Sequence, residues 1–444
     1  MRKIILLESA FYLLLQQQMS FFNLPPRLVF FVFCVYILIS PRHFLAQSTE
    51  KQSLPNSLDS SKISCEKAFK QLDLIDIKKK LLKTHHHLLS KDSIKLKPGK
   101  LYNSYAPVPG YTIVNGFLII VASNFSFLTG TIDSTNVSTI SFNPNYSLSY
   151  QQVMLPLVFN IWTKKNKLNI LGDWRYYYYP TYTYGLGGQT SFFNSDLINY
   201  SYIRLYQEVC KQIPSTKFYV GVGYDLDYHF DIKKIGSVGA GTNFTAYNGT
   251  STNSISSGPA INILYDSRKN SNNPINNSFY SNLTYRNNLT FLGSTQNWQS
   301  IYMDSRAYLK LFRRSDNMLC FWNLNWFTFG GKVPYLDLPS TGWDAYSNTG
   351  RGYIQSRFRS QNMIYLESEY RFGISKNGLF GGVVFVNAES VSDLQTNKFT
   401  SVYPGYGLGI RLKANKFSGV NFCIDYGFGL QGSKGLAFNV SEVF

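Results

Sequence analysis

The chain has 444 residues, of which 16% are aromatic and 15% are charged, and its formal net charge is +18. A basic balance of this size invites a nucleic-acid-binding interpretation. The positive residues are dispersed along the chain, however, and no nucleic-acid motif accompanies them. We therefore exclude nucleic acid as a partner and expect outer-membrane lipids and lipopolysaccharide to balance the charge.

An apolar run covers residues 28–40, preceded by Arg27 and followed by Ala46. A basic start, an apolar middle of roughly 7 to 15 residues and a small residue at the cut are typical of a secretory signal peptide. The run is too short for a membrane-spanning helix, which needs about 20 apolar residues. The sequence predicts a signal peptide over residues 1–46, with a possible true start of translation at Met19.

Residues 47–104 differ in composition from the rest of the chain, and we expect them to form a periplasmic lead-in. Its first part is polar and predicted to be partly disordered, whereas residues 65–89 could form a short amphipathic helix. Three consecutive histidines begin at His85, but neighbouring residues on a helix point in different directions. We therefore favour a solvated surface there and predict neither a metal site nor a cofactor. The cysteines after the predicted cleavage point are far apart, in no metal-ligand spacing: Cys65, Cys210, Cys320 and Cys423.

Alternation of apolar and polar residues dominates residues 105–444. In residues 217–230 one face carries Phe218, Val220 and Val222, and the other carries Asp225, Asp227 and His229. Residues 302–312 and 363–372 repeat the pattern, with charges on one face only. In hydrocarbon every backbone polar group must be paired within the protein, so strands cross a bilayer only as a closed barrel. The pattern predicts an all-β fold, a transmembrane antiparallel β-barrel.

Fifteen segments qualify as strands, and because single-chain bacterial barrels have an even number, we expect one more near Tyr111 and about sixteen in all. The longer connections, residues 231–256 and 331–360, should face outside the cell. The predicted strands are residues 115–127, 136–149, 152–163, 167–179, 199–212, 217–230, 257–267, 277–288, 297–313, 317–330, 361–374, 379–390, 404–414, 418–428 and 435–444.

Five short motifs follow one another in the order found in the BamA/TamA surface-antigen superfamily, which residues 105–444 resemble. The chain carries no recognisable periplasmic POTRA domains, the docking domains of that superfamily. The motifs are Tyr184-Gly185-Leu186-Gly187; Asp266-Ser267-Arg268 with Pro274; Gly350-Arg351-Gly352-Tyr353; Gly405, Gly407 and Gly409 with Arg411; and a C-terminal Phe444 after Phe438 and Val440.

The resemblance implies roles for individual residues. It implies that the loop carrying Arg351, Gly352 and Tyr353 folds into the barrel lumen, where Arg351 pairs with acidic residues of the wall. Glu369 is the best matching acid, whereas Asn387 stands where the family usually has an aspartate and Glu389 where it has a glycine. The alternative for Arg351 is an ordinary solvated loop residue.

The C-terminal residues Phe438, Val440 and Phe444 resemble the strand signal through which the barrel assembly machinery recognises such proteins for insertion. The resemblance further implies an integral outer-membrane barrel of a Gram-negative bacterium that assists insertion or translocation of client proteins, with a periplasmic partner supplying the docking function. A passive diffusion channel or a structural surface antigen is the alternative. No Ser/His/acid set stands out, so we expect no enzyme; Asp225, Asp227 and His229 share a face as any polar lumen would require.

Overall fold

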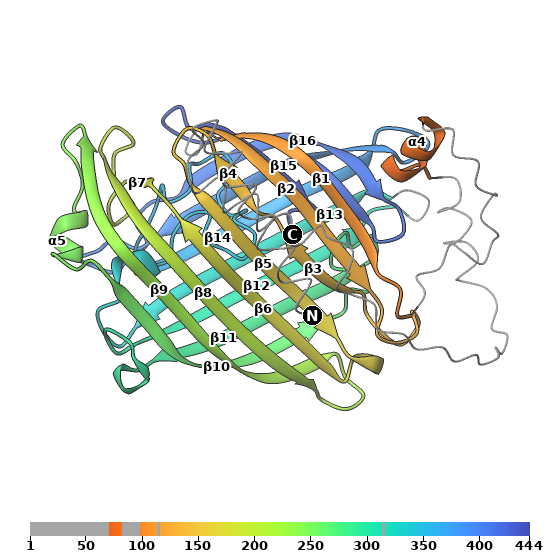
Figure 1. The fold of residues 1–444 in the computed structure, drawn as a ribbon, viewed down its shortest axis with the longest axis horizontal. Helices are drawn as coiled ribbons and strands as arrows, with labels where there is room; N and C mark the ends of the chain where they lie inside the picture. Colours follow the sequence, from red (N-terminus) through yellow and green to blue (C-terminus); the bar gives the residue numbers. More distant parts are fainter. Residues whose placement is uncertain (1–70, 82–97, 113–115, 313–315) are drawn as a thin grey trace, which may run out of the picture.

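The computed structural model describes residues 71–81, 98–112, 116–312 and 316–444, and all of its named strands belong to one antiparallel sheet curled into a barrel (Figure 1). The predicted signal peptide, Met19, Cys65 and the histidines from His85 lie outside the described residues. The strands are β1 (Tyr102–Thr112), β2 (Gly116–Phe127), β3 (Ser138–Phe142), β4 (Asn145–Ser147), β5 (Val153–Trp162), β6 (Leu168–Tyr178), β7 (Thr181–Thr183), β8 (Ser195–Gln212), β9 (Phe218–Val238), β10 (Ser254–Asp266), β11 (Ser278–Asn288), β12 (Trp298–Lys310), β13 (Met318–Phe329), β14 (Asn362–Gly373), β15 (Phe380–Val391), β16 (Tyr403–Asn415), β17 (Val420–Phe428) and β18 (Lys434–Val440). The helices are α4 (Leu74–Leu81), α5 (Phe244–Asn248) and the 3-10 turns η2 (Lys164–Asn166), η3 (Thr290–Leu292) and η4 (Tyr335–Asp337).

The eighteen strands fill sixteen positions around the barrel. Both β3 and β4 pair between β2 and β5, and both β6 and β7 pair with β8, so each of these two couples makes one interrupted strand. Every other strand pairs with its neighbour in the chain, from β1 with β2 to β17 with β18. The predicted all-β barrel is confirmed, and the missing strand expected near Tyr111 is β1.

The two faces of the sheet differ as the alternation predicted. On β9 the side chain of Val222 is 69% exposed on the outer face, whereas Asp225 on the inner face is 2% exposed. The inner faces of β12 and β14 carry the buried Arg306 and Glu367 in the same way. The polar side chains therefore fill the lumen, and the apolar side chains form the outer surface.

The two ends of the barrel are unlike. At one end the strands are joined mostly by short turns, and α4 lies against these turns (Figure 1). Lys416, in the turn after β16, donates to Asp76 of α4 over 2.6 Å, and its backbone N–H donates to the buried Asp73 over 3.0 Å. The opposite end carries the longer loops. None of the described helices has the length and apolarity to cross a membrane.

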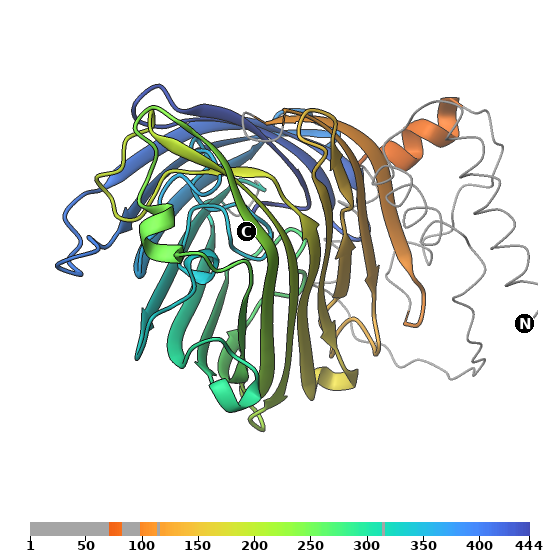
Figure 2. The same ribbon diagram turned by 60° about the vertical axis from the view of Figure 1, so that its left-hand side comes forward.

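Several predicted boundaries were wrong, among them the end of β9 and the end of the last strand. Residues 231–238 were assigned to a loop but continue β9, which pairs with β8 up to Val238. The last strand was expected to reach residue 444 but ends at Val440, because Ser441 adopts a left-handed backbone with φ 80°. The chain then turns into the lumen, so that the C-terminus lies inside the barrel (Figures 1 and 2). Phe444 is only 2% exposed.

The first and last strands meet along what we call the seam. Here β1 and β18 lie side by side, but no register joins them in the part of the chain that the structure describes. A cavity of about 460 Å³ runs beside the seam. It is lined by inner-face residues of β2, such as Leu118 and Ala122, and by Phe438 of β18, which pairs with the outward-facing Ile424. The seam is therefore an apolar and weakly joined part of the wall.

Candidate functional site in the barrel lumen

The connection between β13 and β14 folds inward and occupies the lumen. Its backbone passes close to β17: a Cβ on Gly352 would lie 2.6 Å from the carbonyl oxygen of Phe428, and Gly352 has a φ of +103°. Only glycine combines that approach with that backbone conformation without strain. Near its base, Arg359 donates to the carbonyl oxygens of Tyr335 and Leu336 over 3.0 and 3.2 Å. The loop is thus held at both its base and its tip.

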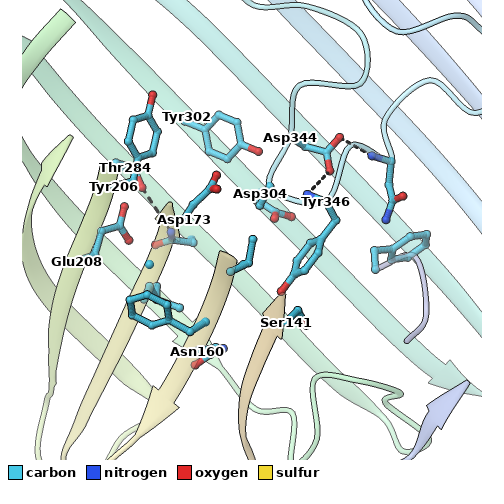
Figure 3. A pocket seen from close by; sticks show the side chains of 18 of the residues that line it. Ser141, Asn160, Asp173, Tyr206, Glu208, Thr284, Tyr302, Asp304, Asp344 and Tyr346 are labelled. Atoms are coloured by element: carbon cyan, nitrogen blue, oxygen red, sulfur yellow. Dashed lines mark hydrogen bonds between the residues drawn. The ribbon is translucent and has the colours of Figure 1, made fainter. Parts of the chain in front are cut away.

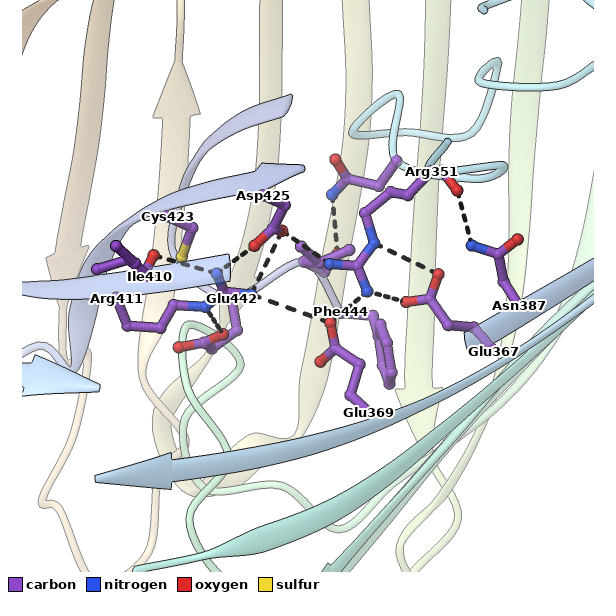
Figure 4. A network of polar contacts seen from close by, with 12 residues as sticks. Arg351, Glu367, Glu369, Asn387, Ile410, Arg411, Cys423, Asp425, Glu442 and Phe444 are labelled. Atoms are coloured by element: carbon purple, nitrogen blue, oxygen red, sulfur yellow. Dashed lines mark hydrogen bonds and ion pairs between the residues drawn. The ribbon is translucent and has the colours of Figure 1, made fainter. Parts of the chain in front are cut away.

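Arg351, at the tip of this loop, contacts three wall carboxylates (Figure 4). Its guanidinium donates to Glu367 and Glu369 of β14, and Nη1 donates to Asp425 of β17 over 2.7 Å. The guanidinium also lies 3.7 Å from the ring centre of Phe385. The predicted contact between Arg351 and Glu369 is confirmed, and Arg351 is 5% exposed and not a solvated loop residue.

Two further arginines extend the contacts into a network. Arg371 donates to Glu369 over 2.6 Å, and Arg411 donates to Asp425 over 2.5 Å and to Glu442 over 2.8 Å. We call the whole set the arginine cluster; its members are Arg351, Arg371, Arg411, Glu367, Glu369, Asp425 and Glu442. The cluster has three positive and four negative side chains. All of them are buried, including that of Glu442, which is 3% exposed, so the cluster nearly balances its own charge away from solvent.

Asn387 and Glu389, two further wall residues singled out from the sequence, contact the loop in other ways. The Asn387 amide donates to the backbone carbonyl of Arg351 over 2.9 Å, so it fixes the loop backbone and leaves the guanidinium to the carboxylates. Glu389 accepts a hydrogen bond from Thr341 over 2.7 Å. Tyr353 donates to the carbonyl of Pro404 over 2.6 Å. These three hydrogen bonds hold the loop in addition to the ion pairs of Arg351.

The three C-terminal residues singled out from the sequence lie in different places. Phe438 lies within β18 and Val440 is its last residue, so both belong to the wall. Phe444 instead lies in the lumen, with its ring 5.3 Å from that of Trp322. Its carbonyl accepts a hydrogen bond from Arg371 over 3.0 Å. Phe444 is therefore part of the lumen packing and does not continue the last strand.

No known family model and no curated protein matches the sequence. Solved structures do resemble the barrel. One is BamA from Haemophilus ducreyi lacking POTRA domains 1–3, with 12% sequence identity and a TM-score of 0.46; the match covers 86% of this chain and 81% of BamA. Another is CdiB from Acinetobacter baumannii, with 10% identity and a TM-score of 0.49, covering 77% of this chain and 59% of CdiB. CdiB from Escherichia coli is similar as well, with 8% sequence identity and a TM-score of 0.48; the match covers 79% of this chain and 68% of that CdiB.

The fold itself is an antiparallel β-barrel with an apolar outer surface and a polar lumen. At such identities the likeness concerns the fold alone, and the described residues include no POTRA domain. The structural neighbours are outer-membrane barrels of Gram-negative bacteria.

Sequence reasoning missed several members of the arginine cluster. Glu367 could have been found, because it lies two residues before Glu369 and so shares its face. Asp425 and Glu442 carry no such local signal, since each lies far from Arg351 in the sequence. What brings them together is the curvature of the barrel and the inward turn after β18.

Proposed function

We propose that this chain is an integral outer-membrane barrel of the surface-antigen type that assists the insertion or translocation of other proteins at the outer membrane of a Gram-negative bacterium. The observation that carries the proposal is the seam. The eleven residues of β1 face the seven residues of β18 without a shared register in the described part of the chain. The backbone N–H and C=O groups of an edge strand can pair with an incoming strand.

The apolar cavity beside the seam supports the same proposal. It is bordered by the inner face of β2, by β17 and β18, and by loop residues Ala345 to Gln355. A client strand entering there would find backbone partners on β1 and an apolar space for alternate side chains. The arginine cluster fixes the loop against β17, the strand beside β18. The wall next to the seam would therefore keep its shape while β1 and β18 separate.

The partners follow from this role. Clients would contact the seam, and a periplasmic protein would deliver them. Lipids and lipopolysaccharide would surround the outer face, and the barrel assembly machinery would insert the chain itself by recognising Phe438 and Val440. The proposed role requires no catalysis and no cofactor.

Site-specific photo-crosslinking in intact outer membranes tests the proposal. A photoreactive residue replaces Tyr105 of β1 (60% exposed) in one variant and Phe438 of β18 in another; Val222 of β9, on the outer face of a strand far from the seam in sheet order, provides the matched control. We expect newly made outer-membrane proteins to be captured at Tyr105 and Phe438 and not at Val222.

Conductance across a planar bilayer distinguishes the alternative. A large, steady current through the purified barrel, unchanged when the loop is shortened, together with no client captured at the seam, would identify a passive diffusion channel. Absence of both current and captured clients would favour a structural surface antigen.

A further inference from the structure

A second cavity, of about 220 Å³, lies in the lumen next to the first and extends away from the seam toward β8 and β9 (Figure 3). The inner faces of β5, β6, β8, β9, β11 and β12 form its wall, and loop residues Trp343 to Tyr346 and the C-terminal Phe444 also line it. Eight carboxylates and four guanidiniums line this cavity, so its charge is predominantly negative. The carboxylates belong to Asp173, Glu208, Asp225, Asp227, Asp304, Asp337, Asp344 and Glu442.

Most of these carboxylates are already bound within the protein. Four pair with arginines: Asp173, Asp227, Asp304 and Glu442. Asp344 accepts backbone N–H groups, and Asp337 accepts a hydrogen bond from Ser256 over 2.6 Å. Two carboxylates remain without a salt bridge among the described residues, those of Asp225 and Glu208. Glu208 is hydrogen-bonded by the neutral side chains of Asn262, Asn282 and Thr284, so its negative charge has no cationic partner.

Asp225 and Glu208 lie close together on neighbouring strands. Asp225 of β9 pairs with Tyr206 of β8, and Glu208 follows two residues later on the same face. Diagonal neighbours of this kind have Cα atoms about 7–8 Å apart and Cβ atoms somewhat closer. The two carboxylates therefore form one acidic face of the cavity.

Unpaired acceptor atoms point to a ligand that donates hydrogen bonds. Asp225 is 2% exposed, yet its Oδ1 has no hydrogen-bond partner, and neither has Oδ1 of Asn282, another lining residue. The neighbouring donor Arg286 is engaged elsewhere: it donates to Asp227 and to two backbone carbonyls, although its Nε remains unpaired. A buried carboxylate without a partner is costly, and a bound cation would relieve that cost.

We propose that this cavity binds a small organic cation, a short aliphatic diamine whose two ammonium groups are held by Asp225 and Glu208. An ammonium group has three N–H donors, so one can reach the unpaired Oδ1 of Asp225 while the other pairs with the charge of Glu208. A cavity of about 150 Å³ accommodates benzene, so this one has room for a four-carbon diamine. Among the described residues no group of three or more His, Cys, Asp or Glu is arranged to hold a metal ion, which favours an organic cation. The proposal is independent of any role in protein assembly.

Isothermal titration calorimetry of the purified full chain in detergent, with 1,4-diaminobutane as the probe, tests this binding. We expect saturable binding of the diamine and none of 1,4-butanediol, which has the same length but no charge. Equal binding of the diol, or no saturable binding of the diamine, would overturn the proposal.

Variants locate the site. The pair Asp225→Asn and Glu208→Gln keeps the side-chain shapes and removes both charges, and we expect the affinity to fall by about tenfold or more. Asp196→Asn is the matched control, because Asp196 is a buried carboxylate on the same strand as Glu208 but does not line the cavity. Heat-modifiable gel mobility verifies folding, and Asp225→Asn alone replaces the double variant if the latter does not fold. Unchanged affinity in the folded variant would contradict the assignment.

Discussion

The wall of the barrel is built differently on the two sides of β17. Toward β14, the arginine cluster joins the loop, three strands and the C-terminal segment through buried ion pairs. Toward β1, the seam has a short last strand, no described register and an apolar cavity. The proposed function assigns different roles to the two sides: the arginine cluster preserves the shape of the barrel, whereas β1 and β18 can separate at the seam. The following changes test that contrast, from the largest expected effect to the smallest.

Replacement of Arg351 should have the largest effect. Arg351→Met leaves Glu367, Glu369 and Asp425 buried without their shared cation, and breaking a buried pair from one side costs about 3–5 kcal/mol. We expect a matching loss in the free energy of unfolding, and cleavage of the loop by added protease. Lys332→Met, an exposed change at the base of the same loop, should leave both measurements unchanged. An equally stable, protease-resistant Arg351→Met variant would show that the cluster does not fix the loop.

The two glutamates of β14 should differ from each other. Glu369 accepts from both Arg351 and Arg371, whereas the only cation that Glu367 contacts among the described residues is Arg351. Glu369→Gln should therefore cost about 3 kcal/mol and Glu367→Gln about 1.5 kcal/mol. Denaturant titration of the two variants side by side measures the difference. A larger loss in the free energy of unfolding for Glu367→Gln than for Glu369→Gln would mean that Glu369 is not the main carboxylate of the cluster.

The base of the loop should respond to pH. Burial, with the neighbouring charge of Asp227, raises the pKa of Asp337 to about 7, although the hydrogen bond from Ser256 lowers it. A carboxyl group whose pKa is higher in the folded than in the unfolded chain favours folding when protonated. Stability should fall as the pH rises from about 4 to about 7, by at most about 1.4 kcal/mol per pH unit, and then level off.

Comparison with Asp337→Asn isolates this carboxyl group from other titrating groups. His229, whose Nδ1 lies 3.4 Å from Asp337, is unchanged in that variant. Thermal unfolding across this pH range should show a shallower slope for Asp337→Asn than for the unchanged chain. Identical slopes would mean that Asp337 does not titrate there.

A change at the seam should matter least. Leu436 of β18 is only half-buried, so Leu436→Ala should cost less than about 1 kcal/mol, well below the 2–5 kcal/mol typical of a packed core leucine. Denaturant titration of Leu436→Ala beside the unchanged chain measures this loss in the free energy of unfolding. A loss above about 2 kcal/mol would mean that β18 is packed as firmly as the rest of the wall, and the contrast with the arginine cluster would not hold.

Local patterns predicted the strands well, because alternation is a property of neighbouring residues. The faces of β9, with Val222 outward and Asp225 inward, could be assigned without any knowledge of the fold. The resemblance to a known family supplied Arg351 and Glu369. The inward turn at Ser441 could not be predicted, since nothing in an alternating segment marks where its pairing stops. Nor could the partners of Arg351 on β17, which depend on how the sheet closes.

The separation of Arg351 from its partners sets an order of events during biogenesis. Glu367 lies 16 residues after Arg351, but Asp425 lies 74 residues after it. Contacts between residues so far apart form late, because the intervening chain must first be ordered. The contact with Asp425 therefore forms only after the strand that carries it has joined the sheet, so the loop is fully fixed late in folding.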